Sequence, residues 1–183
     1  MDGGVAEPVD RRWPATWADD ELRLLWEFLG FLRATAVNKV AGLDRDPATA
    51  APLPGSPMLT PLGVLKHLTA VERAWLSIAG GGADLPSLWD DDDVDHDWRV
   101  GPDETPASVV AAYVAEWDRS AAALAGLAPG DPAAVVVNDK PRTVRWLLAH
   151  VVQETARARG APRRAPRARR RRPRRVRRGR PVR

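Results

Sequence analysis

The chain has 183 residues and no cysteine, which excludes disulfides, thiolate metal ligands and a cysteine nucleophile. The formal charge of the whole chain is +4, but the charges are distributed unevenly. Residues 157–183 hold 15 arginines and no acidic residue, which gives +15. Residues 1–156 hold 13 basic and 24 acidic residues, which gives −11. Without a secretory signal, or an apolar run near the ~20 residues of a membrane span, this acidic domain is expected in the cytoplasm with no membrane partner.

Four helices are predicted in chain order, each preceded by a threonine cap. Thr16, Thr60, Thr105 and Thr143 are the predicted caps, because a threonine hydroxyl accepts from the unpaired N–H groups of a first turn. Proline follows the second and third caps, where its missing N–H costs nothing. Apolar residues then recur every three or four positions, as on one face of a helix. Four tryptophans fall on this pattern and are interpreted as core residues: Trp26, Trp75, Trp117 and Trp146.

The helical segments predict a single domain. Helices of this length bury their apolar faces best as a four-helix bundle, and the connections between them are rich in Pro, Gly and Asp. The predicted architecture is all-α, with a flexible N-terminus over residues 1–15, a four-helix bundle over residues 16–157 and a disordered Arg-rich tail over residues 158–183.

Polar side chains that can bind a metal interrupt two of the apolar faces. His67 lies between Val64 and Val71 on the second helix, and His150 and Glu154 share a face of the fourth. Helix bundles build metal sites from such side chains, and a catalytic zinc keeps three protein ligands and one open position. The alternative stays open: a lone inward histidine is more often a hydrogen-bonded core residue, and His150 and Glu154 can bond to each other.

The acidic run DDDDVDHDW over residues 90–98 invites a calcium interpretation. Counted from Asp91, however, the loop has His96 where a calcium-binding loop needs glycine, and Pro102 where it needs a bidentate glutamate. The run is therefore interpreted as a solvated acidic loop.

Three segments carry a family resemblance: LWEFLGFLRATAVNKVAGLD (25–44), LGVLKHLTAVERAWL (62–76) and TVRWLLAHVVQETAR (143–157). They resemble the DinB-like metalloprotein superfamily, in particular an actinobacterial branch of uncharacterised proteins related to mycothiol-dependent maleylpyruvate isomerase. The resemblance implies a four-helix bundle and a divalent metal, with zinc favoured. The implied ligands are one helix-two histidine and two helix-four residues four positions apart. Carried over, these are His67, Glu154 and a histidine at position 158.

Position 158 is Ala, at the point where the composition changes. The family pattern continues there with His-x-Gly-His. In a GC-rich gene, skipping one base of the codons for residues 158–162 produces codons able to encode His-Ala-Gly-His. We therefore interpret the Arg-rich tail as the product of a one-nucleotide frame change. As written, the chain keeps only His67 and Glu154, with His150 as a second-shell or substitute ligand, so a metal is expected to be weakly held.

The resemblance implies a metal-dependent transferase or isomerase that uses a low-molecular-weight thiol such as mycothiol on a small electrophile. A metal with an open position would lower the pKa of the bound thiol. Loss of the ligand at position 158 is expected to impair this activity, and no catalytic residue is assigned. A homodimer stays open as a partner, since bundles often dimerise.

The alternative function is a non-catalytic bundle with an Arg-rich arm that binds nucleic acid or an acidic partner. Such binding would be non-specific and sensitive to salt, because the tail has no aromatic residue for base stacking. The candidate residues are Arg163, Arg164, Arg169, Arg170, Arg171 and Arg172.

Overall fold

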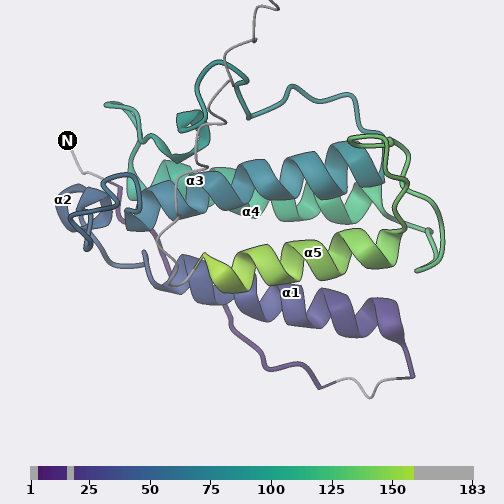
Figure 1. The fold of residues 1–183 in the computed structure, drawn as a ribbon. Helices are drawn as coiled ribbons and strands as arrows, with labels where there is room; N and C mark the ends of the chain where they lie inside the picture. The colour runs from purple at the N-terminus through teal and green to yellow at the C-terminus, as the bar shows by residue number, and fades with distance from the viewer. Residues whose placement is uncertain (1–3, 16–18, 159–183) are drawn as a thin grey trace, which may run out of the picture.

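The computed structural model describes residues 4–15 and 19–158, and these residues form helices and no strand (Figure 1). The main helices are α1 (Glu21–Asn38), α3 (Pro61–Glu72) with its π-helical continuation η1 (Arg73–Gly80), α4 (Pro106–Ala123) and α5 (Val144–Arg157). The predicted all-α fold with four main helices is confirmed. Among the described helices, none has the length and apolar character needed to cross a membrane. The arginines proposed for nucleic-acid binding lie outside the described residues.

Local capping explains where the helices begin. The side chains of Thr60, Thr105 and Thr143 each accept a hydrogen bond from the backbone N–H three residues later, as predicted. The first helix begins instead after Asp20, whose carboxylate accepts from the backbone N–H of Arg23. The predicted cap Thr16 lies outside the described residues.

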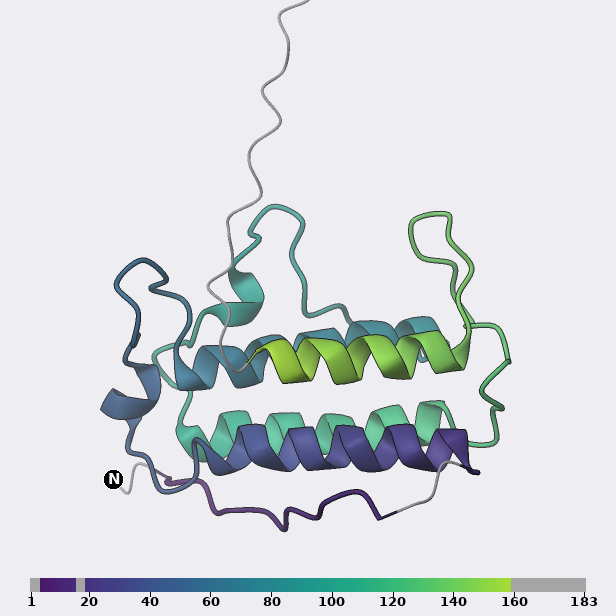
Figure 2. The same ribbon diagram turned by 60° about the horizontal axis from the view of Figure 1, so that its bottom comes forward.

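The order of the helices in space makes one connection long. Figure 2 shows α3 and α4 running in one direction and α1 and α5 in the other. Because α3 and α4 are parallel, the connection over residues 81–105 must return along the bundle before α4 can begin. It carries a short 3-10 helix, η2 (His96–Trp98), which packs against α3. A shorter helix, α2 (Arg45–Thr49), lies in the preceding connection.

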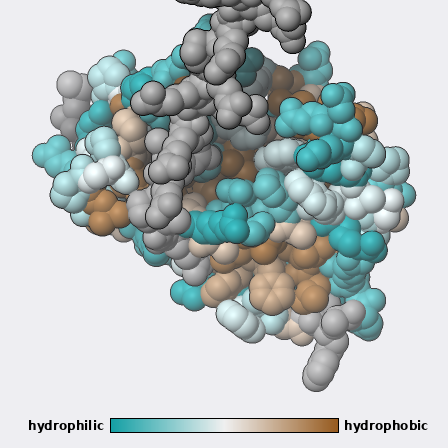
Figure 3. Space-filling view, viewed as in Figure 1, coloured by the Kyte–Doolittle hydropathy of each residue, from teal (hydrophilic) through white to brown (hydrophobic). Residues whose placement is uncertain are grey.

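The N-terminal segment is anchored to the bundle. Residues 4–15, which belong to the predicted N-terminal segment 1–15, lie extended along α1 (Figure 2). The Asn38 side chain bonds both the N–H and the carbonyl of Val9, at 2.8 and 3.0 Å. Trp13 meets the ring of Phe31 edge-on, with 4.9 Å between centroids. In Figure 3 hydrophobic side chains gather in the lower half of the face, where Figure 1 places α1 and this segment.

Buried ion pairs join the helices inside the bundle. Arg33 of α1 bonds the carboxylate of Glu72 of α3 through two nitrogens and also donates to Ser120 of α4 at 2.9 Å. Arg73 also uses two nitrogens, both of which donate to Oε2 of Glu116 in α4. Burial raises the pKa of the Glu72 carboxyl, although Arg33 opposes the change. These contacts satisfy charges that the apolar core could not hold unpaired.

Candidate functional site

A pocket of about 370 Å³ lies between α3 with η1, α5 and the 81–105 connection. Its lining includes metal-ligating, acidic and aromatic side chains: His67, Val71, Trp75, Trp89, Asp90, Asp91, Asp93, Val94, Asp97, His150 and Glu154. The three polar residues singled out on the predicted helix faces, His67, His150 and Glu154, therefore line the same pocket. The connection supplies the acidic wall opposite them.

His67 is held by residues of the connection. Its Nδ1 lies 2.7 Å from Oδ2 of Asp97, and both side chains are buried. Trp89 donates from its indole nitrogen to the same oxygen at 3.0 Å. The ring of His67 stacks on Trp98, with 4.0 Å between centroids and 15° between planes.

Asp97 is the functional candidate that the sequence interpretation missed. The sequence pattern predicts that the whole acidic run over residues 90–98 is solvated, but only 6% of the surface of Asp97 is exposed. Burial of a carboxylate requires partners, and those partners, His67 and Trp89, lie 30 and 8 residues away. Nothing in the spacing of the run distinguishes Asp97 from its neighbours, so only the path of the connection reveals it.

The second ring nitrogen of His67 faces open space. Among the described residues, the fully buried side-chain nitrogens and oxygens without a partner are Tyr113 Oη and Trp117 Nε1. Nε2 of His67 makes no hydrogen bond with any described residue and is not one of these atoms, so it reaches the pocket that the residue lines. This nitrogen is available to an incoming group.

His150, which α5 supplies to the pocket, contacts two aromatic rings. It stacks on Trp146 at 4.8 Å between centroids and meets Trp75 edge-on at the same distance. Burial lowers the pKa of His150; Arg142 acts in the same direction, whereas the Glu154 carboxylate opposes it. No hydrogen bond joins His150 to Glu154, and the Glu154 carboxylate makes no hydrogen bond or ion pair with any described residue.

One of the four tryptophans differs from its predicted core position. Trp146 is 42% exposed, whereas Trp26, Trp75 and Trp117 are half-buried and pack against the core. Arg142 lies over the rings of both Trp75 and Trp146, with its guanidinium carbon 5.1 and 4.5 Å from the centroids. Trp75 therefore both packs against the core and lines the pocket, whereas Trp146 lies at its rim against His150.

The sequence model of the mycothiol-S-transferase family matches residues 24–163 of the chain. The chain belongs to this family. The family is a DinB-like one, which confirms the resemblance carried by the three sequence segments. Membership implies mycothiol as co-substrate and an electrophile as its partner in the reaction. No curated protein and no solved structure gives a match.

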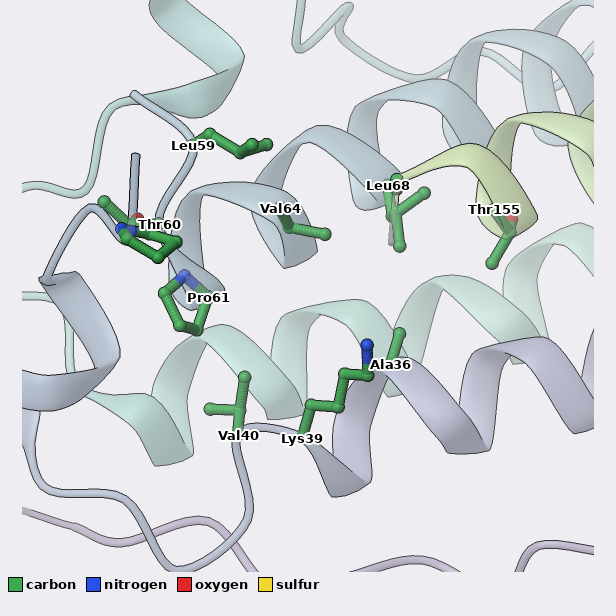
Figure 4. Close-up of a pocket in the computed structure, with 11 residues that line it drawn as sticks. Ala36, Lys39, Val40, Leu59, Thr60, Pro61, Val64, Leu68 and Thr155 are labelled. Carbon is green, nitrogen blue, oxygen red and sulfur yellow. The ribbon is translucent and has the colours of Figure 1, made fainter. Parts of the chain in front are cut away.

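In this mycothiol-S-transferase family member, Ala158 belongs to a neighbouring pocket rather than to the one that holds His67. That second pocket, also of about 370 Å³, is mostly apolar and lies where α5 ends against α1 and α3 (Figure 4). Its lining is Ala36, Lys39, Val40, Pro52, Leu59, Thr60, Pro61, Val64, Leu68, Thr155 and Ala158. Position 158 is also the C-cap of α5, so the helix stops at the residue where the resemblance expects a ligand.

The donor set does not fit a resident metal with three protein ligands. Over residues 4–15 and 19–158, no three His, Cys, Asp or Glu side chains lie close enough together to share an ion. His67 can offer Nε2 and Glu154 its carboxylate, but alanine at position 158 has no donor atom. Position 158 therefore supplies no third donor to accompany His67 and Glu154.

Proposed function

We propose that the pocket lined by His67, His150 and Glu154 binds the thiol end of mycothiol, and that the protein transfers this thiol to a small electrophile. The observation that carries the proposal is the convergence of these three side chains, from two helices, on one pocket in a chain of the mycothiol-S-transferase family. An isomerase reaction would use the same first step, attack of the thiol on a carbon of the substrate.

The chain's own residues can prepare the thiol. The thiolate is the nucleophile, so the S–H proton must be removed. In the proposed step Nε2 of His67 accepts that proton, and the sulfur forms a bond to the electrophilic carbon. The bond between that carbon and its leaving group breaks at the same time. The leaving group departs with the electron pair of this bond and takes up the proton held by His67. Placing the thiol and the electrophile together in one pocket also lowers the entropic cost of their reaction.

We further propose that this activity is impaired by the alanine at position 158. Two protein ligands should hold zinc far more weakly than three, so purified protein is expected to contain much less than one zinc per chain. Metal analysis by mass spectrometry tests this directly, and stoichiometric zinc would overturn it. The Ala158→His variant supplies the missing donor type and is expected to raise the zinc content.

Conjugation of mycothiol to a chromogenic halogenated arene tests the activity itself. Slow turnover is expected for the chain as written, with a further loss in His67→Gln. The control is Asp92→Asn, which changes the acidic run at a residue outside the pocket lining. If mycothiol neither binds nor reacts in the presence or absence of added zinc, the proposed function is wrong.

The frame-change hypothesis has its own test, because it concerns the gene rather than the protein. Resequencing native DNA across the codons for Thr155 to Gly160 is expected to reveal one base gained or lost. An unchanged reading frame would make alanine at position 158 a genuine feature of this chain, and the Arg-rich segment a real tail.

A further inference from the structure

We propose that Asp97 is a positioning residue of this site. Its carboxylate holds the Nδ1–H of His67, so that the lone pair of Nε2 faces the pocket. The contact itself is independent of any reaction, but its consequence for catalysis rests on the proposed thiol-transfer function. The 81–105 connection is then part of the site, a contribution that the apolar and polar faces of the helices alone do not predict.

The hydrogen-bond geometry determines which nitrogen carries the proton. Oδ2 of Asp97 lies 2.7 Å from His67 Nδ1 and 3.0 Å from the indole nitrogen of Trp89, which can only donate. An ionised carboxylate accepts from both. The hydrogen of the His67 contact must then be on Nδ1, which leaves Nε2 of the neutral ring without a proton. A carboxylate behind a histidine orients catalytic and metal-binding imidazoles in the same way.

The ring is fixed from a second direction by Trp98, the residue that follows Asp97. The two rings are nearly parallel, with 4.0 Å between centroids, so the stack holds the plane of the imidazole, while the Asp97 carboxylate selects which of the two ring nitrogens faces the connection. Both contacts come from η2, three residues that pack against α3. One short element of the connection therefore sets both the orientation and the protonation of His67.

Gly63 allows η2 to approach α3 closely enough for these contacts. A Cβ built at position 63 would lie 2.7 Å from the carbonyl oxygen of Trp98 and 2.8 Å from that of Met58. Both neighbours are backbone atoms, which cannot swing aside as a side chain can. The glycine lies one helical turn before His67, so the close approach brings Asp97 and Trp98 to the level of the imidazole.

If the His67–Asp97 pair had only a structural role, both ring nitrogens of the histidine would be hydrogen-bonded or buried. Within residues 4–15 and 19–158, Nε2 has no hydrogen-bond partner and reaches the pocket, whereas Nδ1 lies against the buried carboxylate of Asp97. This asymmetry distinguishes a positioned functional group from a core histidine that is merely satisfied. Asp90, Asp91 and Asp93 also line the pocket, but Asp97 is the aspartate that forms a hydrogen bond with His67.

Nitrogen NMR of protein labelled at histidine tests the proposal. The chain has three histidines, so the ring signals can be assigned with the His96→Gln and His150→Gln variants. The spectra are recorded at a pH well above the usual histidine pKa, where the neutral rings report their tautomer. His67 is expected to carry its proton on Nδ1. Asp97→Ala is expected to abolish this preference, and Asp97→Asn to restore part of it because the amide oxygen can accept the same N–H.

The Asp92→Asn control, the same chemical change in the same acidic run, is expected to leave the tautomer as it is in the unmodified protein. A His67 protonated on Nε2 in the unmodified protein, or a tautomer unchanged in Asp97→Ala, would overturn the proposal. If Asp97→Ala does not fold, the unmodified protein and Asp97→Asn decide the matter through the position of the proton.

Mycothiol conjugation, measured on the same variants, separates the two proposals. If the tautomer responds to Asp97 but no variant reacts with mycothiol, the positioning role stands and the proposed function fails. If the unmodified protein reacts and Asp97→Ala changes neither tautomer nor rate, the function stands and the positioning role fails.

Discussion

At the scale of single residues, the charge on Glu72 depends on one partner. Its side chain is 1% exposed, and Arg33 supplies both nitrogens that face it. Replacing Arg33 by methionine leaves an uncompensated buried carboxylate, and we expect a loss of about 3–5 kcal/mol in the free energy of unfolding. Urea titration measures this loss.

The paired change Arg33→Met with Glu72→Leu supplies the matched control, since it removes both charges together. We expect it to cost less than Arg33→Met alone, because well-packed apolar side chains can replace a buried ion pair. A double variant less stable than Arg33→Met would contradict this expectation, because the unpaired Glu72 carboxylate would then not be the main cost of removing Arg33.

His150 makes the stability of the protein depend on pH. Burial lowers its pKa in the folded protein, so the unfolded chain takes up the proton at a higher pH than the folded one. The contribution of the neutral His150 ring to stability is therefore fully present above the usual histidine pKa. It is lost as the pH falls through the lower pKa that His150 has in the folded protein. We expect the His150→Asn variant to lose less stability on acidification, as measured by thermal unfolding. Parallel curves for the variant and the unmodified protein would contradict this expectation.

At the scale of elements, Gly63 controls how η2 sits on α3. Because a Cβ there would collide with two backbone carbonyls, Gly63→Ala is expected to destabilise the fold by about 1–3 kcal/mol, the usual cost of overpacking. Hydrogen exchange should also become faster at the amides of η2 as the element moves away.

Gly30 provides the control for this substitution. It lies inside α1, where a Cβ would have no other heavy atom within 4 Å, so Gly30→Ala should stabilise the protein by up to about 1 kcal/mol through helix propensity. Equal effects of the two substitutions would mean that close approach at position 63 is unimportant.

At the scale of the whole molecule, the division of charge predicts separable behaviour. Residues 1–156 carry −11 and residues 157–183 hold 15 arginines. The full chain is expected to be retained on immobilised DNA at low salt and released steeply as salt rises, since phosphate binding displaces counterions. A chain ending at Ala158 should pass through unretained. Retention of the shortened chain would place the DNA-binding surface on the helical bundle.

The local features of the fold could be predicted because their causes are local. Thr60, Thr105 and Thr143 cap their helices through bonds that span three residues, and the apolar periodicity identifies the buried faces of the same segments. The family segments lie on these helices and carry the resemblance that the family match over residues 24–163 confirms. His67, His150 and Glu154 could be placed on inward faces for the same reason.

Tertiary structure alone decided what surrounds those side chains. The parallel arrangement of α3 and α4 sends the 81–105 connection back across the bundle, and this path brings Asp97 to His67 across 30 residues. The same packing leaves Trp146 at the surface and turns Ala158 toward a different pocket. Sequence periodicity determines which face of a helix is buried, but the partner on that face depends on the path of chain segments that are distant in sequence.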